Sequence, residues 1–378
     1  MSPLSATLLA WAGALTVVQG VAVARALRRR APWEARAHGA ALVIRPCAGA
    51  EPSLAENLAS TARARWGGEI RVRFAVATGD DPAAEVCETA AKSLRDNGID
   101  ARVVITGADA PNHKAAQLAA VVARETDLPA TVVVADSDTD LTGLPLGALV
   151  ARVESSPRAA AAWVPPVERS ARTAGDRASR ALLGASLHAF PLLAGIDAGG
   201  LVGKLVAMRT DALTAVGGFD ALLRHLGEDM ELARAWRAMG WTVEAAPFVV
   251  PSTASGRPWS SAVARYARWM TVIRAQRPHL LPSYPLLFFG TVPWTALALL
   301  APSRATALAA LCAWSSRALV AYAGARRTGA PFSLADIARG DLLLAAAFAQ
   351  AMRARTVRWR GRALAIQRDG TLAEAPAR

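Results

Sequence analysis

Residues 131–141 read TVVVADSDTDL and place three carboxylates directly after an apolar run. The run itself, residues 131–135, is short and rich in β-branched residues, which is typical of a strand that is covered on both faces. Asp136, Asp138 and Asp140 then stand at alternate positions. Ligands of open α/β sheets bind outside the carboxyl ends of the strands, so this segment predicts a functional site at such an end.

Strand-like and helix-like segments alternate on both sides of this segment, from about residue 41 to residue 250. Short apolar runs predict strands at residues 41–46, 70–77, 101–106, 131–136, 160–165 and 204–209. Residues 83–98 and 112–125 have apolar positions at helical spacing, and the first of them ends in a helix-stopping Asn-Gly. This alternation predicts an α/β domain with a mostly parallel sheet and flanking helices.

The composition favours an anionic partner and a reducing compartment. Lys and Arg number 43 against 30 Asp and Glu, so the formal charge of +13 suits a nucleic acid, a phosphorylated small molecule or an anionic membrane surface. The three cysteines, Cys47, Cys87 and Cys312, are isolated from one another along the chain. This spacing argues against a disulfide framework and against a structural zinc site.

The N-terminus reads as a membrane anchor. Residues 1–24 carry no charge and are followed by Arg25 and by three further arginines at 28–30. An apolar run of about 20 residues can span a bilayer and is longer than the core of a signal peptide, although a cleaved signal is the alternative. We expect residues 1–27 to be the anchor, with the chain after the arginines in the cytoplasm.

A second group of apolar segments lies near the C-terminus. Residues 278–303 carry no charge and predict a span, and residues 305–325, broken by Arg317, predict another. Residues 342–352 are short for a span and suggest an interfacial or re-entrant segment. We therefore expect residues 281–353 to be membrane-associated, with buried core helices as the alternative for the last two segments.

The acidic cluster has two interpretations after a calcium loop is excluded. Such a loop needs Gly at its sixth position and Glu at its twelfth, where this chain has Leu141 and Gly147. One remaining interpretation is a solvated turn with capping carboxylates. The other is a divalent-cation site at Asp136 and Asp138, because Mg²⁺ takes carboxylate oxygens together with phosphate oxygens of a substrate.

Other catalytic motifs are incomplete. Residues 184–188 read G-x-S-x-H rather than the G-x-S-x-G of a nucleophile elbow. Residues 198–205 lack both the first Gly and the final Ser or Thr of a P-loop. The five histidines show no metal-ligand spacing, and we interpret His188 as structural rather than catalytic.

Four short motifs are informative when they are taken in order along the chain. They are Asp80-Asp81 after a strand, Asp136-x-Asp138, Glu228-Asp229 at a helix start, and Arg265-x-x-Arg268-Trp269. This series resembles the D, D-x-D, (E)D and (Q/R)-x-x-R-W motifs of membrane-embedded family 2-type glycosyltransferases. More narrowly, residues 45–58, 111–118 and 205–219 resemble the ceramide glucosyltransferase family (family 2/21 type), to which bacterial hopanoid-associated glycosyltransferases are close relatives.

The resemblance implies a cytoplasm-facing GT-A domain over residues 40–256, a UDP-sugar donor, a membrane-lipid acceptor and a divalent metal, Mg²⁺ or Mn²⁺. By position in the motifs, Asp81 would bind the uracil end of the nucleotide. Asp136 and Asp138 would serve the ribose and the metal on the diphosphate. Asp229 would be the general base.

Arg265, Arg268 and Trp269 would, by the same resemblance, hold the diphosphate and shape the acceptor end of the site. Processive polysaccharide synthases usually have Gln at the first position of this motif, where this chain has Arg265. The chain also lacks the several closely packed spans of a polymer channel. Both features favour the transfer of a single sugar.

The chemistry of sugar transfer calls for residues of these types. Negative charge grows on the departing diphosphate, where a metal ion and guanidinium groups stabilise it, and the planar fork of Arg binds phosphate oxygens in a bidentate way. A carboxylate such as Asp229 can take the proton of the acceptor hydroxyl. One base without a covalent nucleophile would invert the anomeric centre.

Several of these residues also have structural interpretations. The helix dipole alone would favour Glu228 and Asp229 at a helix N-terminus. Asp81 precedes Pro82, which is common in turns. Lys114 lies at a predicted helix start, where it could bind a phosphate of the nucleotide sugar or simply face water.

Two flanking segments complete the expected organisation. Residues 257–280 mix Arg with Trp and Tyr and predict an amphipathic basic helix in the membrane interface. Residues 354–378 predict a basic surface hairpin followed by a tail. A lipid acceptor would present its hydroxyl to the site from this interface.

The resulting hypothesis is an inverting glycosyltransferase of the bacterial inner membrane, multi-pass, that moves one sugar, with glucose first, from a UDP-sugar to ceramide. A hopanoid or diacylglycerol acceptor, or another sugar such as GlcNAc, is the alternative within this class. The alternative from another class is a non-catalytic basic membrane protein. We expect no nucleic-acid partner.

Overall fold

The computed structural model describes residues 3–28, 33, 39–186, 192, 200–253, 256–354, 356–359, 362–367 and 371–374. The chain forms two compact units. The helical unit consists of Met1–Arg29, Val167–Asp197 and Ala254–Val357, and the sheet unit of Arg30–Pro166, Ala198–Thr253 and Arg358–Arg378.

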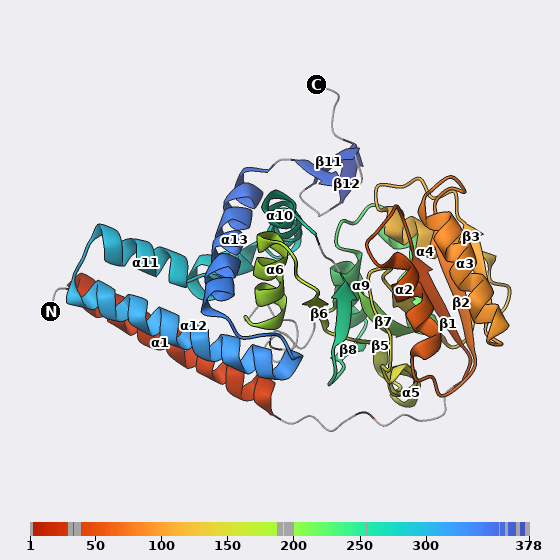
Figure 1. Cartoon of the computed structure of the whole chain (residues 1–378), viewed down its shortest axis with the longest axis horizontal. Helices are drawn as coiled ribbons and strands as arrows, with labels where there is room; N and C mark the ends of the chain where they lie inside the picture. The colour runs from red at the N-terminus through yellow and green to blue at the C-terminus, as the bar shows by residue number, and fades with distance from the viewer. Residues whose placement is uncertain are drawn as a thin grey trace. The chain divides into compact units, whose positions relative to one another are not determined.

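A seven-stranded sheet organises the sheet unit, in the order β3-β2-β1-β4-β7-β5-β8 (Figure 1). Its strands are β1 Ala41–Pro46, β2 Ile70–Val76, β3 Asp100–Ile105, β4 Thr131–Ala135, β5 Ala159–Trp163, β7 Leu205–Arg209 and β8 Thr242–Ala245. Neighbours run parallel except β7, which is antiparallel to both β4 and β5.

Helices cover this sheet because its strands are apolar on both faces. They are α2 Leu54–Ala59, α3 Ala83–Asp96, α4 His113–Arg124, α5 Leu146–Ser155, α8 Thr210–Ala215 and α9 Glu228–Ala238. Ala41 and Val43 of β1 belong to a core with residues of α2, α3 and α5. Leu42 and Ile44 are equally buried and point to the opposite face, since side chains alternate along a strand.

The predicted fold class is confirmed. All six predicted strands and both predicted helices are present, and they form an α/β domain with a mostly parallel sheet. The antiparallel direction of β7 could not be predicted from the sequence pattern, because a strand buried on both faces has the same apolar composition in either direction.

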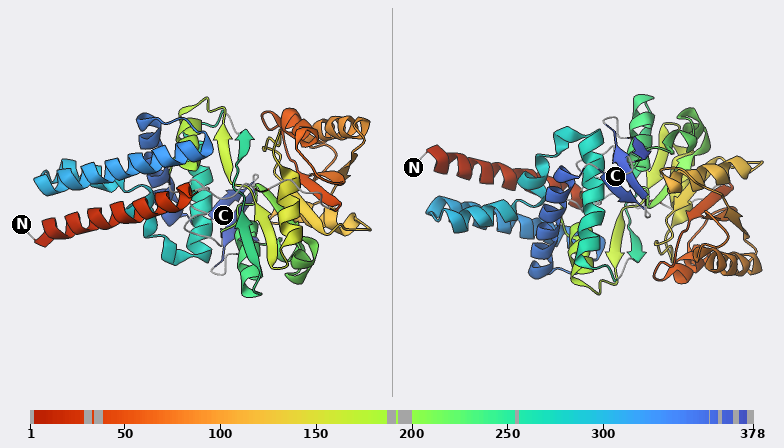
Figure 2. Two further views of the ribbon diagram at one scale, coloured as in Figure 1. Left: turned by 90° about the horizontal axis from the view of Figure 1, so that it is seen from below. Right: turned by 90° about the horizontal axis from the view of Figure 1, so that it is seen from above.

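The helical unit contains α1 Pro3–Leu27, α6 Ala174–Gly184, α10 Trp259–Gln276, α11 Thr291–Leu300, α12 Arg304–Thr328 and α13 Leu334–Arg353, and also residues 167–169 of the strand β6 Pro166–Arg169. α1 and α12 lie side by side along their length (Figures 1 and 2). Small residues such as Ala12, Ala309 and Ala313 are buried where they meet, and small residues let helix backbones approach closely.

Among the described residues, two helices are long and apolar enough to cross a membrane, Ser5–Arg25 and Arg304–Thr328, and the bent pair Pro278–Phe288 and Thr291–Leu300 would be a third span if it crosses as one. The predicted span at 278–303 is not one straight helix. A 3₁₀ turn at Pro278–Leu280 and a π-helical turn at Tyr284–Phe288 precede α11, and the two halves meet at 59°. Pro293, four residues after Phe289, has no N–H to continue a regular helix across this break. The short segment 342–352 lies within α13.

Strands β11 Arg362–Ile366 and β12 Leu372–Glu374 pair antiparallel in the region predicted as a hairpin, and β10 Thr356–Trp359 precedes them. The remaining strand of the sheet unit is β9 Val250–Thr253. His188 lies outside the described residues.

Candidate functional site

Three neighbouring strands end along one edge of the sheet. β1 pairs in parallel with both β2 and β4. Asp81 follows β2, the loop of residues 47–53 follows β1, and Asp136 is the first residue after β4. Parallel strands have their carboxyl ends at the same edge, which is where ligands bind such sheets.

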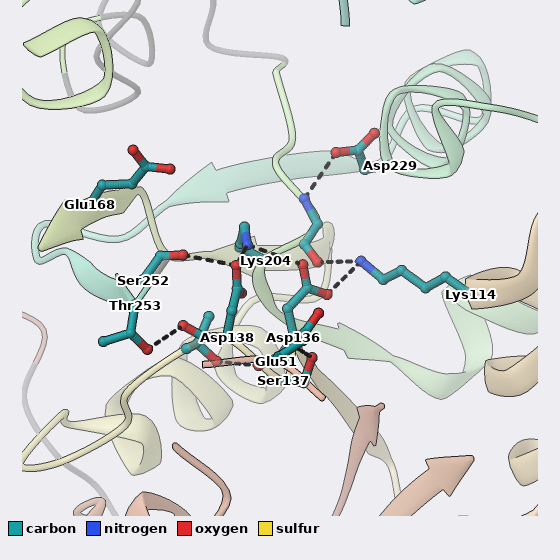
Figure 3. Close-up of polar contacts among 12 residues, drawn as sticks. Glu51, Lys114, Asp136, Ser137, Asp138, Glu168, Lys204, Asp229, Ser252 and Thr253 are labelled. Carbon is teal, nitrogen blue, oxygen red and sulfur yellow. Dashed lines mark hydrogen bonds and ion pairs between the residues drawn. The ribbon is translucent and has the colours of Figure 1, made fainter. Parts of the chain in front are cut away.

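Two lysine side chains from distant parts of the chain bind the D-x-D pair (Figure 3). The Nζ atom of Lys114, the second residue of α4, lies 2.8 Å from Asp136 Oδ1. The Nζ atom of Lys204, just before β7, contacts Asp138 Oδ2 and lies 3.7 Å from Asp136 Oδ2. A backbone hydrogen bond holds Asp136 and Lys204 side by side, because the Asp136 N–H donates to the Lys204 carbonyl at 2.8 Å.

Asp138 is also held from the side of β9. The Ser252 hydroxyl donates to Asp138 Oδ2 at 3.0 Å, and the Thr253 N–H donates to the Asp138 carbonyl at 2.8 Å. The side chain and the backbone of Asp138 are therefore both fixed before any ligand binds.

A fully buried arginine, Arg45, holds the backbone of the D-x-D loop through hydrogen bonds. Arg45, near the end of β1, donates to the carbonyls of Asp136 at 2.9 Å and Thr139 at 2.7 Å, and to the Asn57 carbonyl and the Thr61 hydroxyl. Burial lowers the pKa of Arg45 to about 10, so the side chain stays charged at neutral pH. It ties the loop after β4 to α2 and the turn that follows it.

The Glu228-Asp229 motif meets the D-x-D pair through Lys114. Lys114 Nζ lies 3.3 Å from Glu228 Oε1 and donates to the Gly203 carbonyl at 2.8 Å. The Gly203 N–H donates to Asp229 Oδ2 at 3.0 Å. One lysine thus links the carboxylate after β4 to the carboxylates that open α9.

Gly203 leaves little room for a side chain beside Asp229 and Lys114. A Cβ atom there would lie 3.2 Å from Asp229 Cβ and 3.4 Å from Lys114 Nζ. Contacts that short would push apart the groups that Gly203 joins, so a side chain at this position would disturb both of them.

The electrostatics of this cluster favour a proton acceptor at Asp229. Burial and the neighbouring charge of Glu228 raise the pKa of Asp229 to about 6, against the hydrogen bond from Gly203 and the charge of Lys114. Burial lowers the pKa of Lys114, but the charges of Asp136 and Glu228 outweigh it and raise that pKa above its ordinary value. A carboxylate that titrates near neutrality beside a permanent cation is suited to general-base catalysis.

Asp81 organises backbone in the structure. Its Oδ1 atom accepts hydrogen bonds from the Gly49 N–H at 2.7 Å and from the Ala83 N–H at 2.8 Å. It therefore joins the loop after β1 to the start of α3. The role at the uracil end, which the resemblance implied, stays a prediction.

Two other acidic residues near the D-x-D pair have different partners. Asp140 Oδ1 accepts the Thr142 N–H at 2.9 Å and so stabilises a turn. Ser137, between the two aspartates of the pair, donates to Glu51 Oε2 at 2.5 Å. Burial raises the pKa of Glu51, against the hydrogen bond from Ser137.

The Arg265-x-x-Arg268-Trp269 motif lies on α10 in the helical unit. Arg265 and Arg257 both bind Oε1 of Glu168, which is almost fully buried on β6, and the Arg257 distance is 3.1 Å. The Arg265 guanidinium carbon lies 4.8 Å from the centre of the Trp269 ring, a cation–π distance. Arg268 is half-buried on the same helix.

The D-x-D residues suit a divalent cation that is shared with a substrate. Within the described ranges, no three His, Cys, Asp or Glu side chains converge as a ready-made metal centre. Asp136 and Asp138 supply two carboxylates at a strand end, and Mg²⁺ is usually bound through one or two carboxylates plus substrate phosphates and water. The donor set therefore fits a cation that arrives with a diphosphate.

The structure brings together Asp136, Asp138, Lys114 and Asp229, which were predicted from motifs. It adds three residues that sequence reasoning passed over, Lys204, Arg45 and Glu51. Lys204 lay in a segment tested only as a P-loop, although its place directly before an apolar strand could have suggested a position at a strand end. Arg45 and Glu51 stood within a family-like segment and carried no signal of their own.

Comparison with known proteins gives a family and distant structural likeness. A family model described as glycosyl transferase family 21 matches residues 6–372. No curated protein sequence matches the chain.

Two solved structures illustrate the structural likeness. A mannosyltransferase from Pyrobaculum calidifontis, in complex with GDP-Man and Mn²⁺, is 17% identical with a TM-score of 0.47 over 92% of this chain and 99% of that one. Glucosyl-3-phosphoglycerate synthase from Mycobacterium tuberculosis, in complex with Mg²⁺ and UDP, is 16% identical with a TM-score of 0.36 over 67% of this chain and 82% of that one.

Proposed function

The chain belongs to glycosyl transferase family 21, as its motifs suggested, and we propose that it transfers a single hexose from a UDP-sugar to the hydroxyl of a membrane lipid. Glucose and ceramide are the first choices for sugar and acceptor. A hopanoid or diacylglycerol acceptor, or another sugar such as GlcNAc, is the second. The observation that carries the proposal is the link through Lys114 between the D-x-D pair and Asp229.

Asp136 and Asp138 would hold Mg²⁺ or Mn²⁺ in this proposal. Bound there, the cation would supply charge stabilisation for the departing diphosphate. Both carboxylates are already aligned, because Arg45 and Lys204 fix the loop and Ser252 fixes Asp138. Asp81, at the same edge of the sheet, is our choice for the uracil end of the nucleotide.

Asp229 would act as the general base on the acceptor hydroxyl. Its pKa of about 6 leaves it ionised at pH 7 but still able to take a proton. The Gly203 N–H holds Oδ2, and the Met230 N–H binds Oδ1 at 2.8 Å, so the carboxylate is oriented by backbone alone. In-line attack with this single base would invert the anomeric centre.

The arginine motif of the helical unit would bind the diphosphate. The guanidinium groups of Arg257 and Arg265 converge on the carboxylate of Glu168, so cationic groups gather beside the motif. Arg268 would contribute a further guanidinium group, and Trp269 would shape the acceptor end. Arg is well suited because it binds phosphate oxygens in a bidentate way.

The expected setting is a bacterial inner membrane with the catalytic domain in the cytoplasm. Residues 1–27 and 281–353 would be membrane segments, residues 40–256 the catalytic domain, and residues 257–280 an interfacial helix, followed by a surface hairpin and tail at 354–378. The two candidate spans support membrane association, and interfacial placement would let a lipid reach the site.

Product analysis tests the proposal. The purified full-length protein in lipid nanodiscs is given labelled UDP-glucose, UDP-galactose or UDP-GlcNAc with ceramide, hopanoid or diacylglycerol, with and without a chelator. We expect one labelled glycolipid, and its formation should stop when the chelator removes the cation. If no lipid is labelled from any UDP-sugar, the alternative of a non-catalytic basic membrane protein gains the support that this proposal loses.

A further inference from the structure

Lysine is rare in this chain and is concentrated at the candidate site. The chain has only three lysines, Lys92, Lys114 and Lys204, and all its other basic residues apart from histidine are arginines. Two of the three bind the carboxylates described above. A lysine ammonium is a compact point charge on a flexible stem, whereas arginine presents a rigid planar fork. The site therefore uses the cation that can move most easily.

Lys204 is fixed at its backbone, and its ammonium group is held by the two carboxylates of the D-x-D pair. Its carbonyl accepts the Asp136 N–H, so the start of the side chain is anchored beside the D-x-D pair. Its ammonium group bridges the facing oxygens, Oδ2 of Asp138 and Oδ2 of Asp136, and the side chain is 15% exposed. The ammonium group thus occupies the position between the two carboxylates.

Lys114 is held differently. Its ammonium group has three partners, Asp136 Oδ1, Glu228 Oε1 and the Gly203 carbonyl. Only one of these belongs to the D-x-D pair. Lys114 can therefore keep two partners when a cation binds Asp136, whereas the bonds of Lys204 to this pair are the ones that a cation would take.

We propose that Lys204 is the resident counter-ion of the D-x-D pair, that a divalent cation displaces its ammonium group, and that the freed group then binds the diphosphate of the nucleotide. A divalent cation and an ammonium group repel each other and cannot share the same carboxylate oxygens at contact distance. The diphosphate brings oxygens that can accept the displaced donor. The inference rests on the proposed function, since it concerns the same donor site.

Binding measurements on the full-length protein in nanodiscs test this exchange. Free and bound Mn²⁺ are measured by electron paramagnetic resonance, and UDP binding at saturating Mn²⁺ by calorimetry. The variants are Lys204→Met, which keeps length without charge, and Lys204→Arg, which keeps charge. Lys92→Met is the matched control, because Lys92 is exposed on α3.

Without nucleotide, the Lys204→Met variant should bind Mn²⁺ about tenfold more tightly than the wild type, because the competing positive charge is gone. UDP at saturating Mn²⁺ should bind this variant about tenfold more weakly, because a charge-assisted hydrogen bond is lost. Lys204→Arg should keep the weak Mn²⁺ binding of the wild type, and Lys92→Met should change neither affinity.

Two outcomes would overturn the exchange. Unchanged Mn²⁺ and UDP affinities in Lys204→Met would show that Lys204 neither competes with the cation nor binds the diphosphate. Weaker Mn²⁺ binding in that variant would show that Lys204 supports the carboxylates instead of blocking them. A wild-type protein that binds neither Mn²⁺ nor UDP would instead refute the proposed function itself.

Discussion

Two groups of charged side chains, one in each unit, differ in how their charges balance. In the sheet unit, the carboxylates of Asp136, Asp138 and Glu228 bind two ammonium groups. Asp229 belongs to the same group through the Gly203 N–H, which it accepts. In the helical unit, Arg317 of α12 faces Asp341 of α13, with Arg317 Nε 3.0 Å from Asp341 Oδ1. We call the first the carboxylate cluster and the second the balanced pair.

The balanced pair has partners that match its charges. Thr291 donates to Asp341 Oδ2 at 2.6 Å, and Arg317 Nη1 donates to the Ala185 carbonyl at 2.7 Å. Both charged side chains are almost fully buried. Charged residues in membrane segments usually face a bundle interior and pair with one another, so this pair accounts for Arg317 in a candidate span without any ligand.

The carboxylate cluster, in contrast, sets four carboxylates against three cations, Lys114, Lys204 and the nearby buried Arg45, so its negative charges outnumber its positive charges. An uncompensated charge that is buried lowers the free energy of unfolding unless a bound ion or another charged group neutralises it. The difference teaches that burial of charge alone does not indicate a functional site, whereas unbalanced charge at a sheet edge does. Variants in the carboxylate cluster should therefore lose activity and keep their stability. Variants in the balanced pair should lose stability and keep their activity.

The largest effect is expected from Asp229→Asn. Loss of the base should lower kcat by about 10²–10⁴-fold, while the midpoint of thermal unfolding stays equal or rises at pH 8, because one negative charge is removed from an excess. Labelled-lipid formation and unfolding in detergent measure the two quantities.

Glu231→Gln on the same helix is the control for this variant. Glu231 forms an ion pair with Arg234, which is largely exposed, so its loss should leave kcat unchanged. Equal kcat for wild type and Asp229→Asn would show that Asp229 is not the base. The contrast between a functional carboxylate cluster and a structural balanced pair would then fail.

Asp341→Ala should act mainly on stability. Removal of one partner leaves Arg317 buried without its counter-charge, which destabilises by about 3–5 kcal/mol, and the unfolding midpoint in detergent should fall accordingly. Activity per folded molecule, measured at a temperature where the variant is folded, should be retained. The double variant Arg317→Met/Asp341→Leu should recover most of the lost stability, and a failure to recover would show that the charges do more than balance each other.

Arg45→Met should lower Mn²⁺ affinity about 10–100-fold, as is usual for residues that orient metal ligands. Arg45 holds the carbonyls of Asp136 and Thr139, so its loss should loosen the loop that carries the D-x-D pair. Arg71→Met on β2 is the control, since its partner Asp127 is exposed. Wild-type Mn²⁺ affinity in Arg45→Met would mean that the loop keeps its shape without this side chain.

The smallest effect concerns pH. Asp229 must be ionised to accept a proton, so kcat/KM should fall to about half its plateau near pH 6 and further in proportion to acidity below it. For stability the sign is reversed. The pKa of Asp229 in the folded state exceeds the value of about 3.9 expected in the unfolded chain, so the folded state binds this proton more tightly, and its contribution is full below pH 3.9 and lost as the pH rises through 6.

A pH series of unfolding midpoints checks that sign. Asp229→Asn should match the wild type near pH 4 and be the more stable protein near pH 8. A wild-type protein that gains stability relative to the variant between these values would show that Asp229 is stabilised as a carboxylate, and the raised pKa would be wrong.

Much of this site could be predicted from the sequence, because the chemistry needs particular residue types at strand and helix ends. Asp136 and Asp138 stood at a strand end and Asp229 at a helix start, and the apolar run before the D-x-D pair was one of those that predicted the sheet. Lys204 could not be placed in the same way. Its contact with Asp138 depends on the antiparallel direction of β7, which the apolar pattern of a buried strand does not reveal.

The helical unit shows the same limit. Arg317 was visible only as an interruption of an apolar run, since nothing in the local sequence indicates that Asp341 faces it from the next helix. The bend before α11 was missed because hydropathy averages over residues, whereas a single proline decides whether the helix continues.

The pairing of α1 with α12 has a consequence for how the protein is made. α1 ends at Leu27 and α12 begins at Arg304. At about 5–20 residues per second, roughly 14–55 s of translation separate the two helices. During that interval the face of α1 that packs against α12 lacks its partner helix, so any ribosome that stalls before α12 leaves behind a product with a partly uncovered helix that protein quality control can recognise.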